Sequence, residues 1–491
     1  MAPHSGGILA VSMAGTSPMD MMKGFAGLAC DSREVRQGYL FAALPGSRVN
    51  GAAFIADAVG RGAVAVLGSP QVRREAESLG VHFIADENPR ARLARMAAAF
   101  FGAQPGTIAA VTGTNGKTSV TVFLRQIWSR EGRRAASMGT IGVVAPSGDI
   151  ALAHTTPDPI EIHRVLAELA GQGVDHLALE ASSHGLDQYR LDGVDIAAAA
   201  FTNLTRDHLD YHADFSHYLA AKLRLFSEVM RADGVAVVNV DAPYAGEFVA
   251  AARARLLRVV TVGEKGETLR LVNRTPQADG QALDLIHGGK RYRLALPLVG
   301  DFQASNALVA AGLAIGLGEP ADAVFAALED LHGVPGRLEK VAYAACGAPI
   351  YVDYAHTPDA LETVLKAVRP HVAGRLHVVF GCGGDRDKGK RALMGEAAAK
   401  LADRVIVTDD NPRSEQPAEI RRAILAFCPG AQEIGDRASA IHAAIAGLAA
   451  GDCLVIAGKG HETGQIVGAE IRPFSDREAA IHAALAQGGR A

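Results

Sequence analysis

Cysteine is scarce in this chain of 491 residues, and the few cysteines are scattered. They are Cys30, Cys346, Cys382, Cys428 and Cys453, and no two of them form a CxxC pair. A zinc knuckle and a disulfide framework both require closely spaced or paired cysteines, so this distribution argues against both. We therefore expect free thiols and a protein of the reducing cytoplasm.

Long apolar runs and a basic leader are also missing. No run of 18 apolar residues occurs, which argues against a membrane-spanning helix. The first 20 residues contain one short apolar stretch, Ile8–Val11, without a basic segment before it. We therefore expect a loose N-terminal arm and no signal peptide.

Charge is nearly balanced, because 49 basic residues face 53 acidic ones for a net charge of -4. A surface of this kind gives no sign of broad polyanion binding, so we expect neither a nucleic acid nor a membrane as partner. The short basic clusters Arg133–Arg134 and Lys388–Arg391 are typical of a solvated face or a local phosphate site.

The chain is long enough for about three domains at roughly 150 residues each. Short β-rich runs ending in Gly, Asp, Asn or Thr alternate with helical patterns in two separate regions, 107–241 and 349–458. Near-continuous apolar strands of this type indicate parallel sheets covered by helices. We predict three α/β domains, with breaks at the Gly/Pro-containing FGAQPG and GVPGR: residues 1–102, 103–337 and 338–491.

The segment TIAAVTGTNGKTSV, residues 107–120, combines a strand, a glycine turn and the start of a helix. Apolar residues continue at helical spacing through Val120, Phe123, Leu124 and Ile127. Glycines allow backbone N–H groups to approach phosphate, while Lys117 and Thr118 suit terminal phosphates and Mg²⁺. The full GxxxxGK[ST] pattern fails at Val111, and a glycine turn with a surface lysine is the alternative.

Polar residues follow the next strands of this region. Glu180 ends the strand HLALE, where it can serve as a metal-side carboxylate or be a solvated strand end. The segment AFTNLTRDHLDYH then brings Asn203, Asp207, His208, Asp210 and His212 past another strand end, and one of these histidines is a candidate to face the phosphates or metal. No guanine-reading NKxD motif follows any of the strands, which argues against a G-protein switch.

Eleven ordered motifs together resemble the Mur ligases of bacterial cell-wall synthesis. They are GTNGKTS, HTTPD, LEASSHGLDQYR, TNLTRDHLDYH, YLAAKLRLF, FQASNAL, GVPGRLE, VDYAHTPDAL, GCGGDRDKGKR, DDNPR and AGKGHE. The resemblance runs from the CDSR at residue 30 to the glutamate at 462. It implies an N-terminal domain for a uridine nucleotide, a central P-loop-type ATPase domain and a C-terminal Rossmann-like domain for an amino acid. Its substrates would be small molecules, and we expect a monomer.

The resemblance also implies a reaction. The γ-phosphate of ATP would pass to the D-Glu γ-carboxylate of UDP-MurNAc-L-Ala-D-Glu, and an amine of meso-diaminopimelate would attack the acyl phosphate. Such phosphoryl transfer depends on positioning and charge neutralisation, with ATP and Mg²⁺ as cofactors. The implied catalytic residues are Lys117, Glu180, His208, Lys222 and Arg337.

Further site residues come from the same resemblance. ATP is assigned to Gly113, Thr114, Asn115, Gly116, Lys117, Thr118, Ser119, Asn306, Arg337 and Asp353. Metal is assigned to Thr118, Glu180, His208 and Lys222, the lysine carrying CO₂ as a carbamate; taken alone, a lysine flanked by alanines is a solvated charge. The uridine substrate is assigned to Ser32, Ser47, Arg48, Val49, His154, Thr155, Thr156, Ser182, Gln188 and Arg190, although His154 stands where the family has Asn.

Three strand ends of the last region meet at one edge of the expected sheet, because parallel strands share their C-terminal edge. They bring together Arg386, Asp410, Asn411, Pro412, Arg413, Gly458 and Glu462. Within the resemblance, Arg413 reads the extra carboxylate that distinguishes diaminopimelate from lysine, and Glu462 receives the far ammonium. The run GCGGDR is a poor dinucleotide site, since GxGxxG fails at Arg386.

Alternatives remain within and outside this class. A lysine-adding ligase is opposed by DNPR, because relatives that add lysine usually lack this arginine. A folylpolyglutamate synthetase relative is opposed by the uridine-type N-terminal domain. A nucleotide-gated binding protein without ligase chemistry would show no ADP release dependent on both carbon substrates.

Overall fold

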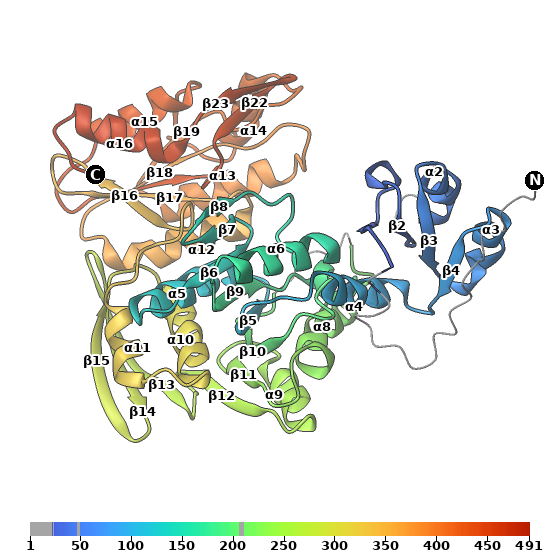
Figure 1. The fold of residues 1–491 in the computed structure, drawn as a ribbon. Coiled ribbons are helices and arrows are strands. Elements are labelled where there is room, and N and C mark those ends of the chain that lie inside the picture. Colours follow the sequence, from blue (N-terminus) through green and yellow to red (C-terminus); the bar gives the residue numbers. More distant parts are fainter. Residues whose placement is uncertain (1–21, 23, 47–49, 206–210) are drawn as a thin grey trace, which may run out of the picture.

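The computed structural model describes residues 22, 24–46, 50–205 and 211–491. The expected N-terminal arm and the site residues Ser47, Arg48, Val49 and His208 lie outside these ranges, as do Asp207 and Asp210. The described chain forms three α/β units, each built on a sheet of its own, and a separate two-stranded hairpin (Figure 1).

The N-terminal unit is a four-stranded parallel sheet in the order β1-β2-β3-β4. Its strands are β1 (Gly27–Ala29), β2 (Tyr39–Ala43), β3 (Ala63–Gly68) and β4 (His82–Ala85), and its helices are α2 (Ile55–Gly60), α3 (Arg73–Ser78) and α4 (Pro89–Phe101). Leu40 and Leu67 face α4, whereas Phe41 and Val66 pack against α2. Because both faces are covered, the strands are continuous apolar runs.

The central unit is an 11-stranded sheet whose middle is parallel, in the order β12-β11-β10-β5-β9-β6. These strands are β5 (Thr107–Thr112), β6 (Ala135–Gly139), β9 (His176–Glu180), β10 (Ile196–Phe201), β11 (Val235–Asn239) and β12 (Arg258–Gly263). Strands not foreseen from the sequence extend both edges: β7 (Gly142–Ala145), β8 (Gly148–Ile150), β13 (Leu269–Gln277), β14 (Gly280–His287) and β15 (Lys290–Leu296). All pairs within these extensions are antiparallel.

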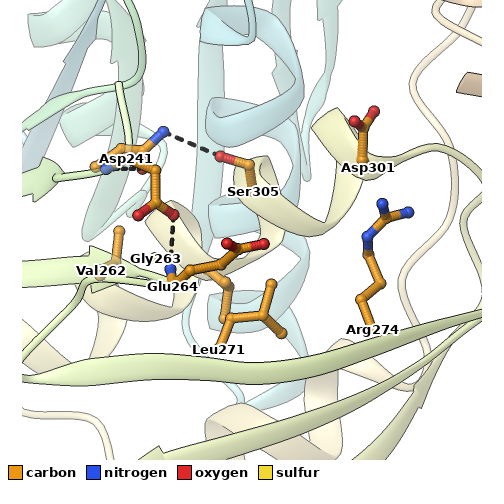
Figure 2. A pocket seen from close by; sticks show the side chains of 10 residues that line it. Asp241, Val262, Gly263, Glu264, Leu271, Arg274, Asp301 and Ser305 are labelled. Carbon is orange, nitrogen blue, oxygen red and sulfur yellow. Dashed lines mark hydrogen bonds between the residues drawn. The ribbon is translucent and has the colours of Figure 1, made fainter. Parts of the chain in front are cut away.

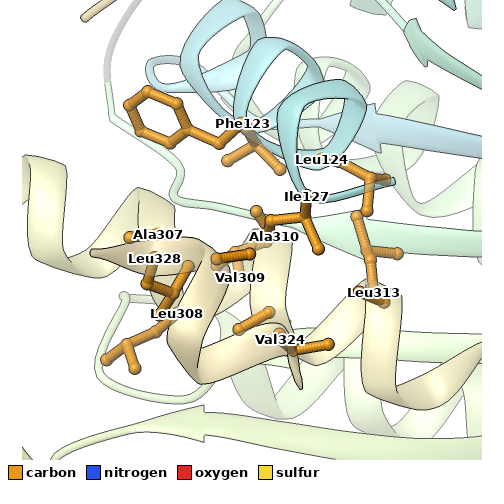
Figure 3. Close-up of a cluster of buried hydrophobic side chains, with 14 of the residues drawn as sticks. Phe123, Leu124, Ile127, Ala307, Leu308, Val309, Ala310, Leu313, Val324 and Leu328 are labelled. Atoms are coloured by element: carbon orange, nitrogen blue, oxygen red, sulfur yellow. The ribbon is translucent and has the colours of Figure 1, made fainter. Parts of the chain in front are cut away.

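Helices cover both faces of the central sheet. The helices are α5 (Lys117–Arg130), α10 (Asp301–Gly316) and α11 (Ala321–Leu328) on one face, and α6 (Pro159–Gly171), α7 (Ser183–Asp187), α8 (Phe215–Arg224) and α9 (Ala245–Ala254) on the other, with a π-helical turn, Leu225–Val229, after α8. The predicted apolar face of α5 is confirmed, since Phe123, Leu124 and Ile127 are fully buried against α10 and α11 (Figure 3).

The C-terminal unit is a six-stranded sheet in the order β16-β17-β21-β18-β19-β20, in which only the edge strand β16 is antiparallel. Its strands are β16 (Glu339–Tyr343), β17 (Pro349–Asp353), β18 (Leu376–Phe380), β19 (Arg404–Val407), β20 (Gln432–Glu433) and β21 (Cys453–Ala457). Its helices are α12 (Pro358–Val368), α13 (Lys390–Leu401), α14 (Pro417–Leu425), α15 (Arg437–Ala446) and α16 (Asp476–Ala486). The hairpin of β22 (Gly464–Val467) and β23 (Glu470–Pro473) stands beside this sheet (Figure 1).

Two expectations from composition can be checked on the structure. All five cysteines are free, as predicted. Within the described ranges, no helix combines the length and apolar character needed to cross a membrane.

Candidate functional site

A phosphate-type loop connects β5 to α5, as the sequence predicts. Gly113 and Gly116 have positive φ angles of 147° and 85°. A Cβ at Gly113 would lie 2.0 Å from the Thr202 hydroxyl, and one at Gly116 would lie 2.3 Å from the Asn306 amide oxygen. Both positions therefore require glycine, and the second places Asn306 of α10 against the loop.

The end of the neighbouring strand β10 holds this loop in place. The N–H groups of Thr114 and Asn115 donate to the carbonyl and side-chain oxygens of Asn203, at 2.8 and 3.0 Å. The Thr202 hydroxyl donates to the Asn115 carbonyl at 2.6 Å. Asn203, which the sequence analysis placed past this strand end, thus supports the loop through its backbone carbonyl and its side-chain oxygen.

Two lysines converge on one carbonyl oxygen of the loop. Lys117 Nζ donates to Gly113 O at 3.0 Å and to Thr114 O at 2.8 Å, while Lys222 Nζ donates to Gly113 O at 2.8 Å. Lys222 is 1% exposed, so the interpretation as a solvated helical lysine is wrong. Helix α8 instead places the Lys222 ammonium group against the phosphate loop.

Tyr218, one helical turn before Lys222, completes this side of the loop. Its hydroxyl is 2.9 Å from the Thr114 hydroxyl, and its ring centre lies 4.6 Å from Lys222 Nζ. His212 packs its buried ring against Tyr218, with centroids 5.3 Å apart. The sequence analysis missed Tyr218, although its i−4 spacing from Lys222 placed both on one helix face.

Glu180 is buried at the end of β9, next to the phosphate-loop strand. Its carboxylate accepts the Thr140 N–H at 2.8 Å and the Thr140 hydroxyl at 3.2 Å, and that hydroxyl lies 3.1 Å from the one of Thr155. The interpretation as a solvated strand end is therefore wrong. Among the described residues, no group of three or more His, Cys, Asp or Glu side chains could hold a metal.

Several residues predicted for the uridine substrate form one hydrogen-bonded network beside Glu180. Arg190 donates to the Thr156 carbonyl and to the Gln188 side-chain oxygen. The Thr156 hydroxyl donates to Glu180 O at 3.0 Å and accepts the Ser182 N–H at 3.1 Å. Burial lowers the pKa of the Arg190 guanidinium, and the Asp158 carboxylate opposes that shift.

Two other residues predicted for this substrate lie outside the network. His154 is exposed and takes part in none of the hydrogen bonds of that network. Ser32 lies in the N-terminal unit, where its hydroxyl bonds to Asp57 and lowers the pKa of that carboxyl group. The two units are in contact through α4, which packs against α6 (Figure 1).

The hinge between the central and C-terminal sheets gathers the other residues predicted for ATP. Asn306 Nδ2 donates to the Gln303 side chain at 3.2 Å, and Gln303 donates to the Arg337 carbonyl at 3.4 Å. The Arg337 guanidinium lies 4.8 Å from the centre of the Tyr354 ring. Asp353 accepts the N–H groups of Leu338 and Ala355, both at 2.7 Å, and its burial raises its pKa to about 6.

The predicted amino-acid crevice, at the C-terminal strand ends of the last sheet, is centred on the DNPR turn, which follows β19. Arg413 is half-buried, and its Nη1 donates to the Gly384 carbonyl at 2.9 Å. Its own backbone has a left-handed φ of 52°. The β22–β23 hairpin holds it, because Arg413 N donates to Ile466 O at 3.0 Å and Gly468 N to Arg413 O at 2.7 Å.

Glu462 lies against the same turn. Its Oε2 accepts Asn411 Nδ2 at 3.0 Å and Lys459 Nζ at 2.9 Å. The predicted ammonium acceptor thus already faces one ammonium, from a lysine that sequence reasoning did not select. The other predicted residues of the crevice divide into Asp410, Pro412 and Gly458, which are buried, and Arg386, which is exposed and hydrogen-bonds to no described residue.

A cavity of about 170 Å³ opens at the ends of β11 and β12, beside the start of α10 (Figure 2). Asp241 in its wall accepts the N–H groups of Glu264 and Lys265 at 2.6 and 2.9 Å. Asn239 connects the cavity wall to the residues that hold the phosphate loop. Its Nδ2 donates to the Ser305 hydroxyl at 3.1 Å and to the Thr202 carbonyl at 2.9 Å. The cavity shares no residue with the predicted sites.

The fold and the loop define the class: an α/β protein with a P-loop-type central domain and a second parallel sheet that presents polar strand ends. Three family descriptions match it in order: Mur ligase family, catalytic domain (25–101); Mur ligase middle domain (111–314); and Mur ligase, glutamate ligase domain (336–460). The chain belongs to the Mur ligase family.

Relatives match nearly the whole chain. A Bradyrhizobium diazoefficiens protein named UDP-N-acetylmuramoyl-L-alanyl-D-glutamate–2,6-diaminopimelate ligase is 59% identical over 464 residues, 94% of each chain. A Mesorhizobium japonicum protein of the same name is 53% identical over 98% of each chain. A solved structure of an enzyme of that name has a TM-score of 0.73 at 35% identity, covering 94% of this chain and 95% of that one.

Proposed function

We propose that this protein is an ATP-dependent ligase that adds meso-diaminopimelate to UDP-N-acetylmuramoyl-L-alanyl-D-glutamate, a cytoplasmic step of peptidoglycan precursor synthesis. The observation that carries the choice of amino acid is the half-buried Arg413, held by Gly384 and the hairpin at the C-terminal edge of the last sheet. Membership of the Mur ligase family and relatives with this name support the ligase chemistry.

The three units divide the substrates between them in this proposal. Residues 1–102, with Ser32, Ser47, Arg48 and Val49, receive the uridine nucleotide. Residues 103–337 bind ATP and, through Thr155, Thr156, Ser182, Gln188 and Arg190, the muramoyl peptide. Residues 338–491 receive the amino acid at 410–413, Gly458, Glu462 and Arg386. The hydrogen-bonded network around Thr156 supports the peptide assignment, because it includes the backbone of Glu180 at the end of β9, which pairs with β5, the strand before the phosphate loop.

The first chemical step joins two anions. A γ-carboxylate oxygen of D-Glu attacks the γ-phosphorus of ATP, and the bond to ADP breaks. Lys117, at the loop, neutralises charge on the phosphates, and Arg337 does so from the hinge once the domains close. Mg²⁺ held by Thr118 and Glu180, with a second metal near His208, would supply further charge neutralisation; one or two carboxylates plus phosphate oxygens are the ligands that Mg²⁺ prefers.

The second step forms the amide. The amine nitrogen of diaminopimelate attacks the acyl carbon, inorganic phosphate leaves with the former carboxylate oxygen, and the nitrogen loses a proton. Arg413 can bind the distal carboxylate through two parallel hydrogen bonds, while Glu462 offers Oε1 to the distal ammonium. With lysine bound, the Arg413 guanidinium would have no substrate carboxylate to bind.

Carbamylation of Lys222 by CO₂ is part of the proposal. Two ammonium groups that share the Gly113 carbonyl repel each other, and burial of Lys222 strengthens that repulsion. A carbamate would replace the second positive charge by a negative one that can support Mg²⁺. With ¹³C-labelled bicarbonate, the wild type should give a carbamate carbon NMR signal that Lys222→Arg lacks; identical spectra would contradict this.

Isotope transfer tests the function directly. The UDP-dipeptide is prepared with ¹⁸O in the D-Glu γ-carboxylate and incubated with ATP, Mg²⁺ and meso-diaminopimelate. Each phosphate released should carry one ¹⁸O, since it leaves with the former carboxylate oxygen. Unlabelled phosphate would indicate hydrolysis by water, and ADP release without the amino acid would indicate a nucleotide-gated protein instead of a ligase.

A further inference from the structure

Lys459 is a buried cation in the crevice that sequence reasoning did not select. It follows β21 within the GKGHE segment, and its side chain has 0% exposure. Its Nζ donates to Glu462 Oε2 at 2.9 Å and to Asn411 Oδ1 at 3.1 Å. Burying an ammonium is costly unless it is paired, so these two acceptors must remain in place for the fold to hold Lys459.

The acceptors also bind each other, which closes a ring of three side chains. Asn411 Nδ2 donates to Glu462 Oε2 at 3.0 Å, and Asn411 Oδ1 accepts the Ile466 N–H at 2.9 Å. Asn411 is therefore fixed by both Lys459 and the hairpin. Each side chain of the ring has its rotamer set by the other two.

The geometry leaves one oxygen of Glu462 for a ligand. Both hydrogen bonds described above fall on Oε2, whereas Oε1 accepts none from the described residues. The Glu462 side chain is 34% exposed, whereas the Lys459 side chain is fully buried. A substrate can therefore reach Glu462 but not Lys459.

We propose that Lys459 is a positioning and specificity-determining residue for the amino acid, an inference that rests on the proposed function. It orients Glu462 so that Oε1 receives the distal ammonium of the substrate. It also balances the charge of Glu462, which would otherwise attract the Arg413 guanidinium of the same turn. Arg413 thus stays available for the distal carboxylate, and the two halves of the zwitterionic end are read by separate groups.

Steady-state kinetics of Lys459→Met test this role through the separate KM values of the three substrates. The KM for diaminopimelate should rise about tenfold to hundredfold, the effect of losing one or two charge-assisted hydrogen bonds. The KM values for ATP and the UDP-dipeptide should stay within about twofold, since Lys459 does not touch the phosphate loop. Lys366→Met is the matched control, because Lys366 pairs with Glu362 on the surface of the same unit.

A double variant distinguishes a role of Lys459 in positioning Glu462 from a role in the stability of the protein alone. Lys459→Met leaves Glu462 without its cationic partner, whereas Lys459→Met with Glu462→Gln removes the charge imbalance. The double variant should recover thermal stability but not the KM for diaminopimelate. An unchanged KM in Lys459→Met, or an equal rise of all three KM values that the double variant reverses, would overturn the proposal. A wild type without diaminopimelate-dependent turnover would instead overturn the proposed function itself.

Discussion

Asp353 is a carboxyl group buried between the end of β17 and the hinge at Leu338. It accepts two backbone N–H groups at 2.7 Å, and burial nevertheless raises its pKa from 3.8 to about 6. Because its pKa is higher in the folded state, its contribution to stability is fully present below pH 3.8 and is lost as the pH rises through about 6.

Replacement of Asp353 by asparagine removes this titration. The free energy of unfolding of Asp353→Asn relative to the wild type should therefore rise between pH 4 and pH 7, by about 3 kcal/mol at most. The variant should also lose some free energy of unfolding at every pH, because the single oxygen of an amide cannot replace the two carboxylate oxygens that accept the two N–H groups. Urea unfolding at several pH values measures the slope, and a difference that stays flat would contradict the buried, neutralised carboxyl group.

The burial of Lys222 and Lys459 could not be predicted from their local sequence. Taken alone, Lys222 in YLAAKLRLF was interpreted as a solvated helical lysine, and Lys459 in AGKGHE was not selected. Both are buried because partners distant in sequence surround them: Gly113 in one case and Asn411 in the other. Only the resemblance to a family pointed to Lys222, and nothing pointed to Lys459.

The DNPR turn is an element whose position depends on a close contact with the loop after β18. A Cβ at Gly384 would lie 1.9 Å from the Pro412 carbonyl oxygen, and its φ is not of the left-handed type, so the obstacle is space alone. Gly384→Ala should therefore displace the turn and raise the KM for diaminopimelate more than about tenfold, with little change in the KM for ATP.

Gly447→Ala is the matched control in the same unit, since its added Cβ would meet only carbonyl oxygens 3.6 Å away. It should leave all kinetic constants near those of the wild type. Equal kinetics for Gly384→Ala and Gly447→Ala would show that the contact at Pro412 does not position the turn.

Helices α15 and α16 are tied to the end of β21 by one buried ion pair. Arg437 Nε and Nη2 donate to the two carboxylate oxygens of Asp476 at 2.6 and 2.7 Å, and Nη2 also reaches Ala457 O at 2.9 Å. Asp476→Ala should lower the free energy of unfolding by about 3–5 kcal/mol, the cost of leaving a buried charge unpaired. Denaturant unfolding measures this, with the surface variant Glu470→Ala as control; equal effects would contradict the argument.

The elements differ in how far the sequence reveals them. The parallel strands were predicted because burial on both faces makes them continuous apolar runs, as in HLALE and CLVIA. The antiparallel extensions β13–β15 were missed, since one face of these strands is solvated and charged residues interrupt the pattern, as in LRLVNRTPQ. The close approach of strand ends at the crevice was predictable from topology, whereas its hydrogen bonds were not.

In the whole molecule, the proposed reaction requires sites on two sheets to act together. The phosphate loop lies in the central sheet and the arginine turn in the C-terminal sheet, and the hinge near Arg337 joins them. The family match covers both sheets, while the domain boundaries at residues 102 and 337 stay predictions. The central claim is that Arg413 couples recognition of the distal carboxylate to ATP use at the loop.

The most direct test is ADP release with ATP, Mg²⁺ and the UDP-dipeptide, comparing meso-diaminopimelate, L-lysine and no amino acid. The wild type should turn over with diaminopimelate and discriminate against lysine by roughly 10⁴-fold, because bound lysine would leave the half-buried Arg413 without a carboxylate partner. Arg413→Ala should lose diaminopimelate turnover, whereas Arg404→Ala, at an exposed arginine of β19, should retain it. Equal turnover with lysine, or an active Arg413→Ala, would contradict the account.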